Sequence, residues 1–203
     1  MGDYALDELW KSYEKREKTR ELLKTKYKLS KSKKITILAL PQMAEHGYLD
    51  WETHFNYIHK IITSCLHSDS ELLISLHPKM DTQKYAYLAE KFNCTILEER
   101  LFNVLAAADI FLSKASSVIR WGVMCNINVI LFDFWNFDVD NYQYLNSIDI
   151  VLELEQLNTI FISRLNQPQD HSAVHDLLSR ESLFDGKSMH RYAELIYKKS
   201  TQA

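Results

Sequence analysis

From Lys33 onward, short apolar runs alternate with amphipathic segments, and this alternation limits the folds that are open to the chain. The runs are short and are bounded by Pro or polar residues, which favours buried strands. Strands that alternate with helices form a parallel sheet with helices on both faces. The runs lie at 35–40, 71–76, 94–97, 110–112, 129–132 and 150–152, and helices are expected at 51–66, 81–92, 101–107, 116–125, 155–164, 170–182 and 188–199. The sequence therefore predicts an α/β fold with a parallel sheet of five or six strands.

The first 32 residues follow a different pattern. They begin with an apolar stripe at helical spacing, formed by Leu6, Leu9, Trp10 and Tyr13. Residues 11–34 then carry eleven Lys or Arg against three Glu. We expect one long helix over 6–29, packed at its start and solvated later, which connects residues 1–32 to a domain spanning 33–203. The stripe offers a route to a homo-oligomer. A nucleic-acid surface is disfavoured because few aromatic residues separate the basic ones and the rest of the chain is acidic.

The composition excludes several classes of protein. Only 4 Gly and 3 Pro occur among the 203 residues, which rules out collagen-like and linker-like chains. There is no run of about 18 apolar residues, and the first residues lack the apolar region of a signal peptide. Cys65, Cys94 and Cys125 lie far apart in apolar surroundings, which predicts reduced, buried thiols. We expect a cytoplasmic protein, with peripheral attachment at the inner membrane face as an open alternative.

Polar residues follow the first two predicted strands. The C-terminal ends of parallel strands meet at one edge of a sheet, and ligands bind in the crevice outside that edge. The loop after the first strand offers Gln42, Glu45 and His46. Glu45 and His46 are candidate catalytic acid and base residues, and Gln42 is a candidate substrate-binding residue. His77, which follows the second strand and precedes Pro78, can donate a hydrogen bond to a phosphate or sugar oxygen.

The segments after the fourth and fifth strands add further candidates. Ser116 and Ser117 place two hydroxyls beside the free N–H groups of a helix start, and Arg120 can bind a diphosphate with two hydrogen bonds. Asp133 opens a loop rich in Asp and aromatic residues, whose side chains suit sugar hydroxyls and ring faces. No GxGxxG, P-loop or metal-ligand spacing occurs, so we expect no cofactor and no metal.

Three segments resemble a known superfamily. The run ADIFLSKASSVIRWGVMCNINVILFDF, residues 108–134, resembles the nucleotide-binding motif of GT-B glycosyltransferases and of the related UDP-GlcNAc 2-epimerases. ISLHP, residues 74–78, resembles the His-Pro turn of the same superfamily, and PQMAEHG, residues 41–47, lies where the epimerases carry a His-Arg-Glu-Asn loop. The pattern is most similar to that of capsule and lipopolysaccharide biosynthesis proteins, and it covers residues 33–155.

The resemblance implies a single Rossmann-like domain of the C-terminal GT-B type, which binds a nucleotide-sugar. By position, it places His77, Ser116 and Ser117 at phosphate or sugar, and Glu45 at the acid/base position. A GT-B enzyme has two such domains, so a second domain or a partner chain would carry the acceptor site. The favoured function is one half of a glycosyltransferase in surface-polysaccharide synthesis. A UDP-sugar epimerase or hydrolase half, and a non-catalytic nucleotide-binding or interaction domain, are the alternatives.

Overall fold

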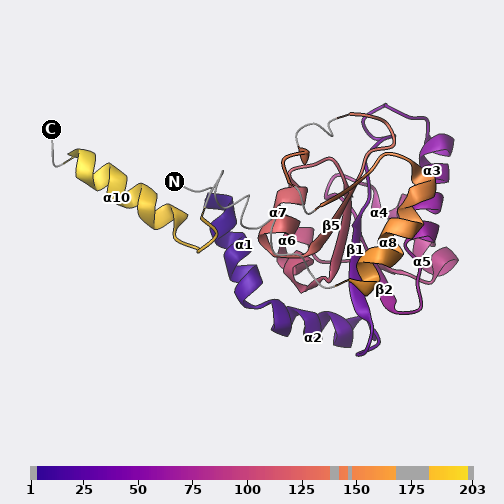
Figure 1. Ribbon diagram of the computed structural model, residues 1–203, viewed down its shortest axis with the longest axis horizontal. Coiled ribbons are helices and arrows are strands. Elements are labelled where there is room, and N and C mark those ends of the chain that lie inside the picture. The colour runs from indigo at the N-terminus through magenta and orange to yellow at the C-terminus, as the bar shows by residue number, and fades with distance from the viewer. Residues whose placement is uncertain (1–3, 138–141, 146–147, 168–182, 201–203) are drawn as a thin grey trace.

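A computed structural model describes residues 4–137, 142–145, 148–167 and 183–200 of the chain (Figure 1). Helices and strands alternate through most of it, as the apolar pattern predicts. The strands are β1 (Lys34–Ala39), β2 (Ser70–Ser75), β3 (Thr95–Ile96), β4 (Ile110–Lys114), β5 (Asn128–Phe132) and β6 (Asp149–Val151). The helices are α1 (Tyr4–Glu14), α2 (Arg16–Lys26), α3 (Trp51–Ser64), α4 (Thr82–Tyr85), α5 (Tyr87–Phe92), α6 (Leu101–Val104), η1 (Leu105–Ala107), α7 (Val118–Met124), η3 (Leu154–Gln156), α8 (Leu157–Asn166) and α10 (Ser188–Ser200).

The described strands form one six-stranded sheet in the order β3-β2-β1-β4-β5-β6, and every pairing is parallel. The predicted α/β fold with a parallel sheet is therefore confirmed. The chain runs outward from β1 to β3 and then returns to the other side of β1, where β4 pairs with it. The loops after β1 and β4 consequently leave the same edge in opposite directions, which opens a crevice between them.

Hydrophobic cores lie on both faces of the sheet. Successive side chains of β1 point to opposite faces of the sheet. Ile35 and Ile37 pack in the core formed with α1, α2, α6 and α7. Leu38 packs in the core formed with α3, α4, α5 and α8. Because both faces are covered, the strands are almost continuously apolar, as is typical of parallel sheets. That continuity is why they stand out in the sequence.

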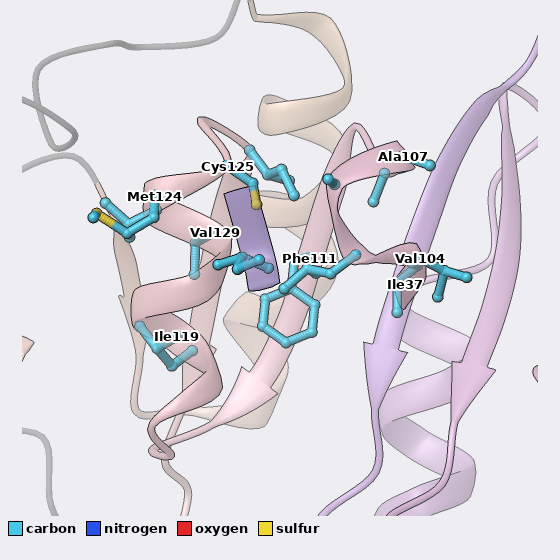
Figure 2. Close-up of a cluster of buried hydrophobic side chains, with 14 of the residues drawn as sticks. Ile37, Val104, Ala107, Phe111, Ile119, Met124, Cys125 and Val129 are labelled. Carbon is cyan, nitrogen blue, oxygen red and sulfur yellow. The ribbon is translucent and has the colours of Figure 1, made fainter. Parts of the chain in front are cut away.

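The face under α7 is packed closely. Figure 2 shows Ile119 and Met124 from α7 beside Val129 of β5 and Phe111 of β4. A Cβ atom built on Gly122 would lie 2.8 Å from Cγ2 of Val129, so the absence of a side chain lets α7 approach β5. The helix that follows β4 is thereby held against the sheet.

The N-terminal region differs from its prediction in two ways. It forms two helices with a break at Lys15, and α2 is packed rather than solvated. Leu23 is 2% exposed and belongs to the core, and the Arg20 guanidinium bonds to the Ala107 carbonyl and pairs with Asp109 just before β4. The basic residues on the outer face hid this contact in the sequence, because their charges dominate the helical pattern.

The predicted oligomer stripe is occupied within the chain. Leu6 and Leu9 are buried in the core, and the Trp10 ring packs edge-on against Phe184 at 5.1 Å. The Asp7 carboxylate also accepts hydrogen bonds from the first two backbone N–H groups of α10, Ser188 at 2.9 Å and Met189 at 2.9 Å. Residues of the stripe therefore pack within the chain, next to the start of the C-terminal helix, which extends away from the body in Figure 1. The homo-oligomer stays a prediction.

The remaining expectations have mixed outcomes. The helix predicted over 81–92 divides into α4 and α5, and the one over 101–107 divides into α6 and η1. The helix predicted over 170–182 lies outside the described residues. Cys65 and Cys125 are buried, Cys94 is half-buried, and all three are free thiols. In the described part of the chain, no helix is both long and apolar enough to cross a membrane.

Two adjacent leucines test the docking of α2. We expect Leu23→Ala to lower the free energy of unfolding by about 2–4 kcal/mol, because it leaves a cavity in the core. Leu22→Ala, which truncates a side chain that is 60% exposed, should change it by less than about 0.5 kcal/mol. Urea denaturation measures both. Equal and small effects would show that α2 does not pack on the sheet.

Candidate functional site

A cavity of about 760 Å³ lies at the C-terminal edge of the sheet. It is lined by the residues that end or follow four strands: 39–42 after β1, 75–78 after β2, 97–102 after β3 and 113–118 after β4. His46, Met80, Thr82 and Trp121 complete the wall. Its volume falls in the range of small-molecule sites, and its place beside the β1–β4 pair is where such sheets bind ligands.

The loop after β1 separates two residues that are adjacent in sequence. Gln42 and the exposed His46 line the cavity, whereas Glu45 is not among the lining residues. Glu45 instead accepts a hydrogen bond at 2.6 Å from the hydroxyl of Tyr85 on α4. Of the two predicted acid and base residues, His46 is therefore the one that a ligand in the cavity could contact.

Glu45 belongs to a chain of hydrogen bonds behind the cavity. The Tyr85 hydroxyl donates to Glu45 and so accepts from Nε2 of His54, which lies 2.9 Å away on α3. His54 and Tyr85 are both fully buried, and burial lowers the pKa of His54 and raises that of Tyr85. The neutral His54 ring thus carries its proton on Nε2. These bonds fasten the loop that carries His46 to two helices.

His77 lies on the cavity wall, in a turn where one nitrogen of its ring accepts a hydrogen bond from the backbone. Its Nδ1 accepts a hydrogen bond from the backbone N–H of Lys79 at 3.2 Å. A neutral ring with Nδ1 as acceptor carries its proton on Nε2. The exposed ring therefore keeps one N–H donor available, which suits an oxygen of a phosphate or a sugar, as the sequence predicts.

The segment after β4 contributes hydroxyls and a cation. Ser116 and Ser117 line the cavity, and Ser117 stands at the start of α7 without forming a side-chain capping bond. Its hydroxyl is therefore not used for capping. Lys114, the last residue of β4, also lines the cavity. Sequence reasoning passed over this lysine, although it stands two residues before the serine pair.

Two predicted binding residues lie away from the cavity wall. Arg120 is exposed on α7 and does not line the cavity, although Ser117, Val118 and Trp121 do. A helix turns about 100° per residue, so residue 120 lies about 200° around the axis from residue 118. Asp133 is 2% exposed, and its carboxylate accepts from the backbone N–H of Phe137 at 2.7 Å. It organises the loop after β5.

Charged residues of both signs line the cavity. Lys114 and Arg100 line it, and among the described residues neither has an ion-pair partner. The carboxylates of the same wall, Glu98 and Glu99, are engaged by Lys26 of α2 at 2.8 and 2.5 Å. Tyr27 also donates to Glu99 at 2.6 Å. Although burial opposes it, these hydrogen bonds lower the pKa of Glu99 and keep it charged and paired.

No set of three or more His, Cys, Asp or Glu side chains in the described ranges could hold a metal ion. The polar side chains that line the cavity include hydroxyls, imidazoles and two cations, beside the amide of Gln42 and the carboxylates of Glu98 and Glu99. The hydroxyl, imidazole and cationic groups can donate hydrogen bonds to an oxyanion, and the charged donors form the stronger ones.

Comparisons with known proteins agree with the topology. No protein-family model matches the sequence, and neither does any curated protein. Among solved structures, the chain is similar to WaaG, a glycosyltransferase involved in lipopolysaccharide biosynthesis, with a TM-score of 0.55 and 16% identity over 88% of this chain and 50% of that one. It is similar to the wall teichoic acid polymerase TagF, with a TM-score of 0.54 and 16% identity over 98% of this chain and 51% of that one.

A third similar structure is a Listeria monocytogenes protein assigned as a UDP-N-acetylglucosamine 2-epimerase. Its TM-score is 0.57 and its identity 13%, over 85% of this chain and 47% of that one. The chain thus spans about half the length of the structures that it matches. At these identities the likeness establishes the fold alone: the chain has the Rossmann-like α/β fold of about half of each of these structures.

Two tyrosine–histidine pairs test the network behind the cavity. We expect Tyr85→Phe to lower the free energy of unfolding by about 1.5–3 kcal/mol, because it leaves the buried His54 and the half-buried Glu45 without their shared partner. The control is Tyr87→Phe, which removes a 2.8 Å bond to His59 at the surface and should cost less than about 0.5 kcal/mol. Thermal and urea denaturation measure both. Equal effects would mean that the Glu45 bond does not hold the loop.

Proposed function

We propose that this chain is the nucleotide-sugar-binding half of a glycosyltransferase that acts in surface-polysaccharide synthesis. The observation that carries the proposal is the cation Lys114, which has no ion-pair partner among the described residues and stands beside Ser116 and Ser117 in a cavity at the β1–β4 crevice. A diphosphate is the anionic group that links a nucleoside to a sugar, and ammonium and hydroxyl donors are suited to it. The similarity to WaaG, which is involved in lipopolysaccharide biosynthesis, and to the wall teichoic acid polymerase TagF supports the cellular role.

In this proposal, different residues of the cavity contact different parts of the ligand. Lys114, Ser116 and Ser117 contact the diphosphate, and the Nε2–H of His77 donates to a phosphate or sugar oxygen. Arg100, which follows β3, supplies a second positive charge to the cavity. Gln42, in the loop after β1, binds the substrate. These donors stabilise the negative charge that grows on a leaving diphosphate, which is how such a site would assist glycosyl transfer.

His46 takes the proposed acid/base role from the same loop. It lines the cavity, and its loop is held by the bond between Glu45 and Tyr85. Glu45 thus acts as a positioning residue for His46 in this proposal. The acceptor site would lie on a second domain or a partner chain, because the chain spans about half of the enzymes whose fold it shares.

An epimerase half is the second candidate. It is favoured by the Glu45–His46 loop after β1 and by the match to the Listeria monocytogenes structure. Both candidates require the same diphosphate site, so binding experiments test what they share. Product analysis with UDP-N-acetylglucosamine separates them, since an epimerase changes the sugar without an acceptor.

Two substitutions that each remove one positive charge test the anion site. We expect Lys114→Met to weaken binding of inorganic pyrophosphate about ten- to hundredfold, because it removes a charge-assisted hydrogen bond worth about 1.5–3 kcal/mol. Arg120→Met removes the same charge outside the cavity and should change affinity less than about threefold. Isothermal titration calorimetry measures both. An equal loss in the two variants would mean that binding depends on overall charge and would overturn the proposal, as would a wild-type chain that does not bind pyrophosphate.

A further inference from the structure

Two exposed aromatic rings meet beside the cavity. Tyr48 is 56% exposed and follows β1, whereas Phe137 is 39% exposed and follows β5. Their ring centroids lie 4.8 Å apart with the planes tilted by 50°. Single exposed aromatic residues are common, but a pair brought together from loops 89 positions apart in sequence is a built feature of the fold.

The ring pair, meaning Tyr48 and Phe137, is continuous with the anion site. The Lys114 ammonium lies 4.8 Å from the Phe137 centroid and 5.8 Å from the Tyr48 centroid, and Lys114 itself lines the cavity. The His46 ring, which also lines the cavity, lies 6.1 Å from the Tyr48 ring. A molecule held at Lys114 is therefore within reach of both aromatic faces.

Both rings are held in place by their backbones. The Tyr48 N–H donates to the carbonyl of the fully buried Met43 at 2.9 Å, after a turn at Gly47 with a φ of 73°. The Phe137 N–H donates to the buried Asp133 carboxylate at 2.7 Å, after Asn136 with a φ of 54°. This bond gives a role to the predicted site residue Asp133. These bonds hold the backbone from which each ring projects, which reduces the entropy lost when the loops bind a ligand.

We propose that the ring pair is a second subsite, which stacks on a ring of the ligand whose phosphate binds at Lys114. This inference rests on the proposed function and adds where a ring of the ligand binds: the ring is either the flat face of a nucleobase or the apolar C–H face of a sugar. Stacking on aromatic side chains tolerates different rings because it depends on the ring face rather than on hydrogen bonds. The Lys114 ammonium and the His46 ring lie next to the ring pair, so polar substituents on the ligand's ring can form hydrogen bonds with them.

The test compares ligands with and without a ring. The double variant Tyr48→Leu/Phe137→Leu keeps apolar side chains and removes both flat faces. We expect it to bind inorganic pyrophosphate as the wild type does, and to bind at least one ring-bearing ligand roughly five- to hundredfold more weakly. The ligands are the diphosphates of uridine, cytidine, guanosine and adenosine, and UDP-N-acetylglucosamine. Tyr87→Leu, which alters a half-exposed ring of α5 that is not a cavity residue, should leave every affinity unchanged.

Calorimetric affinities separate the outcomes. Weaker binding of a nucleoside diphosphate identifies the stacked ring as the base, and weaker binding of UDP-N-acetylglucosamine with UDP unchanged identifies it as the sugar; either supports the subsite. If pyrophosphate binds but no ring-bearing ligand binds more tightly than pyrophosphate, or if the double variant binds all of them as the wild type does, the subsite is overturned while the anion site stands. If pyrophosphate fails to bind the wild type, the anion site and the subsite both fall.

Discussion

The parallel pairing of β1 with β4 is the constraint on which the site depends. Five successive residues of β4 pair with β5, and four pair with β1, so the ends of these strands are fixed to one edge. The chain leaves β1 and β4 toward opposite sides at that edge, and the cavity fills the space between. Lys114 and His46 are far apart in sequence, and this pairing is what brings them to the wall of the same cavity.

The helices added at the N-terminus complete the electrostatics of that cavity. The chain as a whole has a net charge of −3, and two carboxylates stand in the cavity wall after β3. Lys26 of α2 pairs with both, and burial of Leu23 keeps α2 in place. This pairing reduces the repulsion that the two carboxylates would exert on the anion proposed to bind there. The sequence of α2 suggests a charged connector, but in the folded chain α2 contributes to the electrostatics of the cavity wall.

More of the fold than of the site could be predicted from the sequence. Strand positions followed from apolar runs buried on both faces, and parallel topology then indicated which loops share an edge. His77, Ser116, Ser117, Gln42 and His46 line the cavity for that reason. Side-chain placement within a loop or helix depends on tertiary contacts that the pattern does not contain. Glu45 forms a hydrogen bond with Tyr85, and the Asp133 carboxylate accepts one within its own loop. Arg120 lies on a side of α7 that does not line the cavity, whereas Lys114 does line it.

The central claim is that the β1–β4 crevice binds an anion, and mapping of backbone amide chemical shifts by ¹H–¹⁵N NMR tests it most directly. Pyrophosphate should shift amides in residues 113–118, 77–79 and 97–102, which surround the cavity. The opposite edge of the sheet, at residues 31–34, 69 and 109, should stay unchanged and serves as the internal control. Shifts confined to that opposite edge or to α10, or none at saturating pyrophosphate, would contradict the account.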